Sequence, residues 1–223
     1  MFKKNKEKIF CIGLNKTGTT SLGSFFEKNS FKVANQNEGE LLLKSYLARD
    51  FNSIIGYVKK SKSSVFQDVP FSLPFTFPHL DLAFPNSKFI LTIRNSDDDW
   101  YQSILKFHSD FYNNEKKPTY ESLENSKYVY KGWSAKVMLD VFIENKENMY
   151  DKEEFKKVYN TYNKSVIDYF KNKPDKLIVI NLSLKNDFER LCSYLKISTN
   201  ENCFPKISSK DILNGNYNCE FLK

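Results

Sequence analysis

The sequence predicts an α/β fold, a three-layer sandwich in which a central parallel β-sheet is flanked by helices. Short runs rich in β-branched and aromatic residues alternate along the chain with longer segments of helical periodicity. Strands that alternate with helices favour parallel pairing, with helices on both faces of the sheet. A length of 223 residues is enough for one sizeable core. We therefore expect a single domain over residues 1–223.

The predicted elements follow one another without a repeat or a Pro/Gly-rich linker. The β-prone runs cover residues 8–12, 31–34, 64–67, 89–93 and 177–180. Helical patterns cover residues 20–28, 39–60, 75–84, 97–107, 133–144, 153–171 and 187–195. A stretch rich in Lys, Asn and Glu at residues 113–127 predicts a loop, and residues 108–150 together predict a helical insertion.

Composition and charge limit the classes of function. The hydrophobic fraction of 40% and the aromatic fraction of 16% are those of a globular chain and exclude extensive disorder. A net charge of +7 suits an anionic partner such as a nucleotide. The basic residues alternate with acidic ones instead of forming a stripe, which argues against a nucleic-acid partner. No apolar run approaches the ~20 residues of a membrane helix, so we expect a cytoplasmic protein without a membrane span.

The strongest functional signal follows the first predicted strand. Residues 13–21 read Gly-Leu-Asn-Lys-Thr-Gly-Thr-Thr-Ser and lead into a predicted helix. Backbone N–H groups of such a loop point into one concavity, and the helix dipole adds partial positive charge, so the segment predicts a phosphate site. The hydroxyls of Thr19, Thr20 and Ser21 add donors. The structural alternative is a tight turn with a Thr or Ser N-cap.

The position of the lysine separates this loop from that of ATP- and GTP-binding proteins. Their pattern, G-x-x-x-x-G-K-[ST], has Lys directly after the second glycine. Here Lys16 precedes Gly18, and Thr19 stands where that Lys would be. The usual arrangement of metal and γ-phosphate is therefore not written in the sequence. A nucleotide kinase or NTPase, with Asp68 as a metal ligand, stays an alternative, as does a non-catalytic anion-binding protein.

The segment Lys16-Thr17-Gly18-Thr19-Thr20 resembles the 5'-phosphosulfate loop of the PAPS-dependent sulfotransferases, often written P-K-S-G-T-T. PAPS is 3'-phosphoadenosine 5'-phosphosulfate. Asn15 replaces the usual Pro, and Thr17 replaces the usual Ser. The resemblance implies a P-loop NTPase-like fold and a sulfotransferase that uses PAPS and releases PAP. It also implies that the donor is bound by Asn15, Lys16, Thr17, Gly18, Thr19, Thr20 and Ser21.

A second family motif is an Arg at a strand end and a Ser eight residues later, which together grip the 3'-phosphate. Arg94 ends such a run here, and Ser103 lies nine residues further on. The guanidinium fork suits a phosphate, although Arg94 could instead pair with the aspartates of residues 97–99. Residues 176–205, ending in Phe-Pro, resemble the family's late strand and helix. Residues 207–217 only faintly resemble its C-terminal loop over the nucleotide.

The resemblance also implies a catalytic base. Cytosolic family members use a His in a short segment that ends in Pro, and residues 65–70 read Val-Phe-Gln-Asp-Val-Pro. Asp68 stands at that place, and related sulfotransferases use a carboxylate, so the expected catalytic residues are Lys16 and Asp68. Burial or a neighbouring carboxylate would have to raise the pKa of Asp68. The alternatives are a turn role for Asp68 and a base at His79 or His108.

No metal is expected, because a sulfuryl group carries less charge than a phosphoryl group and no cluster of His, Asp and Glu has ligand spacing. The expected acceptor is a small molecule or a glycan. Its pocket would come from the variable residues 35–60 and 108–150.

Overall fold

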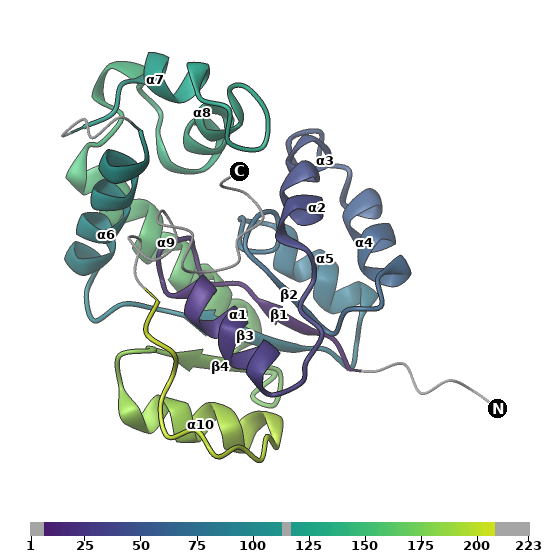
Figure 1. Cartoon of the computed structure of the whole chain (residues 1–223). Coiled ribbons are helices and arrows are strands. Elements are labelled where there is room, and N and C mark those ends of the chain that lie inside the picture. The colour runs from purple at the N-terminus through teal and green to yellow at the C-terminus, as the bar shows by residue number, and fades with distance from the viewer. Residues whose placement is uncertain (1–6, 113–116, 208–223) are drawn as a thin grey trace. The chain divides into compact units, whose positions relative to one another are not determined.

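A computed structural model describes residues 7–112 and 117–207 of the chain. The chain forms two compact units (Figure 1). The first consists of Met1–Ile93 and Asn163–Pro205, and the second of Arg94–Tyr162 and Lys206–Lys223. The long helix α9 (Lys152–Phe170) contributes its first part to the second unit and its last part to the first. A single domain over the whole chain stays a prediction.

The first unit is built on a parallel sheet, as the sequence predicts. In the described residues its strands are β1 (Ile9–Cys11), β2 (Val65–Gln67), β3 (Lys88–Thr92) and β4 (Leu177–Ile180). Their order is β2-β1-β3-β4, and every pairing is parallel (Figure 1). Phe10 of β1 lies opposite Phe66 of β2 and Phe89 of β3. The carboxyl ends of these strands form the edge at which ligands gather in such sheets.

The strand predicted at residues 31–34 is wrong. This segment makes one isolated bridge, between Val33 and Val65, and Ala34 N–H donates to the Val65 carbonyl at 2.8 Å. The next residue, Asn35, already caps α2, because its side chain accepts a hydrogen bond from Glu38 N–H at 3.2 Å. The helix start leaves too little extended chain for a ladder.

The helices of the first unit mostly follow the predicted segments. The long helix predicted over residues 39–60 is instead divided, because Arg49 is left-handed (φ 56°) and Asp50 caps a new helix by accepting Ser53 N–H at 3.1 Å. Besides the end of α9, the helices are α1 (Thr19–Lys28), α2 (Gln36–Leu41), α3 (Leu43–Leu47), α4 (Phe51–Lys60), α5 (Thr76–Ala83) and α10 (Lys185–Leu195).

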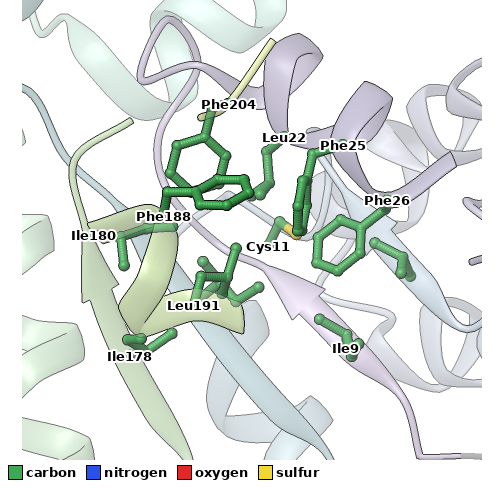
Figure 2. Packing of buried hydrophobic residues seen from close by; sticks show 12 residues of the cluster. Ile9, Cys11, Leu22, Phe25, Phe26, Ile178, Ile180, Phe188, Leu191 and Phe204 are labelled. Carbon is green, nitrogen blue, oxygen red and sulfur yellow. The ribbon is translucent and has the colours of Figure 1, made fainter. Parts of the chain in front are cut away.

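The two faces of the sheet carry different side chains, because successive strand residues point to opposite faces. One face is aliphatic and packs against Leu22 and Phe25 of α1, Phe188 and Leu191 of α10, and Phe204 (Figure 2). Its strand residues are Ile9, Cys11, Val65, Ile90, Ile178 and Ile180. The other face is aromatic, and its rings contact Phe71, Phe84 and Phe170 at centroid distances of 4.7–6.2 Å. Its strand residues are Phe10, Phe66 and Phe89. Both faces are therefore covered, which gives the three layers that the sequence predicts.

The second unit is helical within its described residues. It contains α6 (Asp97–Phe111), α7 (Tyr120–Asn125), α8 (Trp133–Val137), the π-helix η1 (Met138–Phe142), the 3₁₀-helix η2 (Lys146–Asn148) and the start of α9. Its core centres on Trp100, whose ring stacks on Tyr159 at 4.8 Å and contacts Phe142 and Phe155 at 5.8 Å. Among residues 7–112 and 117–207, no helix has the length and apolarity needed to cross a membrane.

Candidate functional site

The loop between β1 and α1 leads into a helix N-terminus that has a glycine as its N-cap. Gly18 is the N-cap of α1 with a left-handed backbone (φ 105°), and the first turn contains no acidic residue. No side chain in the described part of the chain caps this helix end. The N-terminal pole of α1 therefore keeps its partial positive charge and its amide donors directed at the loop, which is an arrangement that binds an anion.

Two threonines of the loop point into the protein. Thr17 is 2% exposed, and its hydroxyl donates to the Leu14 carbonyl at 2.6 Å and lies 2.5 Å from the Thr92 hydroxyl. Thr19 is also buried and donates to Asp68 Oδ2 at 3.2 Å. The side chains of Asn15, Lys16 and Thr20 are only half-buried. The hydroxyls of Thr17 and Thr19 thus bond within the fold. Binding of PAPS by these two residues stays a prediction.

Asp68 lies directly after β2 and next to this loop. Its side chain is 7% exposed, Oδ1 accepts Val69 N–H at 3.2 Å, and Oδ2 accepts the Thr19 hydroxyl. Burial raises the pKa of the Asp68 carboxyl, while the two hydrogen bonds and the charge of Lys16 act in the opposite direction. The structure therefore brings together Lys16 and Asp68, the two residues that the sequence predicts as catalytic.

The backbones of both residues are unusual. Lys16 has φ 69° and Asp68 has φ 62°, in the left-handed region that glycine favours. Such conformations persist where the surroundings fix them, and they concentrate at functional sites. The segment after Asp68 is fixed to the loop as well, since Ser72 N–H donates to the Asp68 carbonyl at 2.9 Å and the Ser72 hydroxyl donates to Asn15 at 3.3 Å.

In the second unit, Arg94 and Ser103 contact each other. Arg94 Nη2 donates to the Ser103 hydroxyl at 3.2 Å, so the spacing of nine residues does not prevent the contact. Arg94 N–H donates to the Tyr159 hydroxyl at 2.9 Å. Burial lowers the pKa of the Arg94 guanidinium, and Tyr159 and Asp99 oppose that shift. An arginine keeps its charge at physiological pH despite such a shift.

The aspartates that follow Arg94 pair with lysines of α9. Asp98 lies 2.7 Å from Lys152, and Asp97 lies 3.6 Å from Lys156. Ser96 caps α6 by accepting Asp99 N–H at 3.0 Å. The cap sets where α6 begins and hence where Ser103 lies on it.

Each of the two histidines contacts an aromatic side chain of its own unit. His79 is exposed, and its ring stacks on Phe51 at 3.9 Å. His108, in the second unit, lies with Nδ1 2.9 Å from the Tyr150 hydroxyl. The role of Asp68 as the base stays a prediction, with His79 and His108 as its alternatives.

Two residues of interest were missed by the sequence analysis. Glu40 of α2 is 2% exposed, and Gln36 donates to its carboxylate at 3.0 Å. Its neighbour Gly39 lies against the segment after Asp68, because a Cβ there would be 3.3 Å from the Val69 carbonyl. The sequence signal for this contact was Gly39 itself, because a glycine inside a polar helix indicates a close approach of another segment. Tyr159 of α9 is buried, and its hydroxyl accepts the Arg94 N–H at 2.9 Å.

Within residues 7–112 and 117–207, no group of three or more His, Cys, Asp or Glu side chains is placed to hold a metal ion. Of the faintly similar C-terminal segment, residues 208–217 lie outside the described residues.

The chain matches a known protein family. A family model described as the sulfotransferase domain covers residues 8–212, a span that contains the loop, Asp68, Arg94 and Ser103. No curated protein matches the chain.

Proposed function

Because the chain belongs to the sulfotransferase domain family, we propose that it transfers the sulfuryl group of PAPS to a hydroxyl or amine of an acceptor. One observation carries the proposal further than the family does. The buried carboxylate of Asp68 is hydrogen-bonded to Thr19 of the loop and lies within the electrostatic influence of Lys16. A proton acceptor, Asp68, and a cation, Lys16, therefore lie close to each other at the loop.

The residues present fit an anionic nucleotide donor. The N-terminus of α1 offers backbone donors without an acidic side chain in its first turn. Lys16 adds a full positive charge beside them. In the second unit, the guanidinium of Arg94 and the hydroxyl of Ser103 lie in contact, and both groups can donate hydrogen bonds to a phosphate. We assign the 5'-phosphosulfate to the loop and the 3'-phosphate to Arg94 and Ser103.

In the proposed reaction, Asp68 accepts a proton and Lys16 stabilises the leaving group. Bound PAPS supplies an activated sulfuryl group, attached to a phosphate through a bridging oxygen. Asp68 takes the proton of the acceptor hydroxyl or amine while the acceptor atom forms its bond to sulfur. The bond between sulfur and the bridging oxygen breaks at the same time. Lys16 stabilises the negative charge that this oxygen acquires, and PAP is the second product.

Burial makes Asp68 a better base than an exposed aspartate. An ordinary aspartate, with a pKa near 3.9, is too weak to accept a proton from an acceptor efficiently. Burial raises the pKa of Asp68, and the Thr19 hydroxyl and the Val69 N–H orient the carboxylate.

The acceptor proposed here is a small molecule or a glycan. The cytoplasmic location expected from the sequence also stays a prediction.

The first test is calorimetric titration of the purified chain with PAP, beside ATP with and without Mg²⁺. We expect PAP to bind without metal and at least about tenfold more tightly than ATP, because only PAP has the 3'-phosphate assigned to Arg94. Binding of Mg²⁺-ATP without any preference for PAP would contradict the proposal and favour a kinase.

A further inference from the structure

The end of β3 meets the loop at Gly13. A Cβ at Gly13 would overlap the Thr92 hydroxyl and would lie 2.6 Å from the Thr92 carbonyl oxygen. Only glycine permits so close an approach of two backbones. The side chain of Thr92 can reach the loop for this reason.

The hydroxyls of Thr92 and Thr17 form a chain of two hydrogen bonds with a defined direction, which we call the relay. The Leu14 carbonyl can only accept, so the single hydroxyl proton of Thr17 goes to it, over 2.6 Å. The Thr92 hydroxyl, 2.5 Å from the Thr17 hydroxyl, must then be the donor of the second bond. Thr92 is 0% exposed. Hydrogen bonds buried in this way are strengthened by the low local dielectric constant.

Thr17 is the residue between two left-handed positions. Lys16 precedes it with φ 69°, and Gly18 follows it with φ 105°. Glycine adopts this conformation freely, but lysine does so only where neighbouring contacts hold it. The relay fixes the side chain of Thr17 and thereby the peptide that joins it to Lys16.

We propose that Thr92 is a positioning residue for sulfuryl transfer, which holds Lys16 in its left-handed, donor-binding conformation through Thr17. The inference rests on the proposed role of Lys16. It gives Thr17 and Thr92 a shared task, in which neither hydroxyl touches the donor. Thr92 also precedes Arg94 by only two positions in the chain, so one short segment serves both phosphate-binding motifs.

The test is a double-mutant cycle on PAP affinity with Thr92→Val and Lys16→Ala, measured by calorimetry. We expect Thr92→Val to weaken PAP binding about tenfold in the parent and less than about twofold in the Lys16→Ala background. Thr92→Ser, which keeps the hydroxyl, should restore the affinity. Thr76→Val is the matched control, because Thr76 is also 0% exposed and its hydroxyl has no partner among the described residues. It should leave PAP affinity unchanged.

Equal weakening in both backgrounds, or none in the parent, would overturn the proposal. A second measurement does not depend on PAP. Amide hydrogen exchange of residues 13–21 in the ligand-free protein should be at least about fivefold faster in Thr92→Val than in Thr76→Val. If the parent protein failed to bind PAP, the assignment of PAPS as the donor would be wrong, but hydrogen exchange would still test whether Thr92 holds the loop through Thr17. Unchanged exchange in Thr92→Val would overturn that role. If Thr92→Val did not fold, Thr92→Cys, which is only a weak donor, would take its place.

Discussion

The loop of the first unit and the Arg94–Ser103 pair of the second unit differ in how their side chains are used. In the loop, Thr17 and Thr19 donate to groups of the protein, and Lys16 has a left-handed backbone. In the pair, a half-buried arginine that follows β3 by two residues donates to a serine on α6. The loop therefore depends on its shape, whereas the pair depends on its charge. Substitution of Lys16 or Asp68 should therefore lower turnover, whereas substitution of Arg94 or Ser103 should mainly weaken PAP affinity.

The largest effect is expected for Lys16→Ala. Transfer should fall by at least about 10³-fold, because the developing charge on the bridging oxygen loses its cation. The measurement is turnover with PAPS at saturating acceptor. The matched control is Lys59→Ala, an exposed lysine of α4, which should keep full turnover. Transfer that survives in Lys16→Ala would mean that the loop binds the donor without taking part in the chemistry.

Asp68→Asn should lower turnover about 10²- to 10⁴-fold while PAP affinity changes by less than about threefold, since the change removes the general base and keeps the side-chain shape. Single-turnover kinetics and calorimetry measure the two quantities separately. Glu40→Gln is the comparison, because Glu40 is the other buried carboxylate beside this segment. If Glu40→Gln abolished turnover and Asp68→Asn did not, the base would be Glu40.

The pH profile sharpens the same prediction. Burial raises the pKa of Asp68, and a base acts in its deprotonated form. Turnover should therefore rise with pH through this raised pKa and then level off. Asp68→Asn should lose the rising limb on the acid side.

Arg94→Ala should weaken PAP binding about 10- to 100-fold and leave turnover at saturating PAPS nearly unchanged, because hydrogen bonds to charged groups contribute about 1.5–3 kcal/mol. Adenosine 5'-monophosphate, which lacks the 3'-phosphate, is the control ligand, and its affinity should not change. Equal PAP affinity in parent and variant would refute the assignment of Arg94.

The smallest effect is expected for Ser103→Ala. The Ser103 hydroxyl accepts a hydrogen bond from Arg94, and its own proton can be donated to the proposed 3'-phosphate. Loss of one neutral donor should lower PAP affinity about threefold. A loss as large as that of Arg94→Ala would mean that Ser103 mainly orients the arginine, and the comparison of Arg94→Ala with the double variant would then show no further loss.

The sequence predicts what is local and misses what is distant. The strand at residues 177–180 and the helix start at Asp97 agree with the structure, because hydrophobic periodicity and caps are local signals. The contact of Arg94 with Ser103 follows from a motif within one strand and helix. The partners of Thr17 and Thr19 could not be predicted, since they lie 75 and 49 residues away. The left-handed backbone of Lys16 was equally hidden, because lysine rarely adopts it. Aspartate adopts this conformation more often, but its residue type alone does not predict it at Asp68.

The unequal faces of the central sheet have a consequence for folding. Sliding any strand by one position would exchange its inward and outward side chains. On β1, the ring of Phe10 would then enter the layer that holds Ile9 and Cys11, and these two smaller side chains would lie among the phenylalanines. A mismatch in volume of that kind creates both overlap and empty space. The contrast between an aliphatic and an aromatic layer thus disfavours misaligned strands. It also fixes the position at which each strand ends and its loop begins.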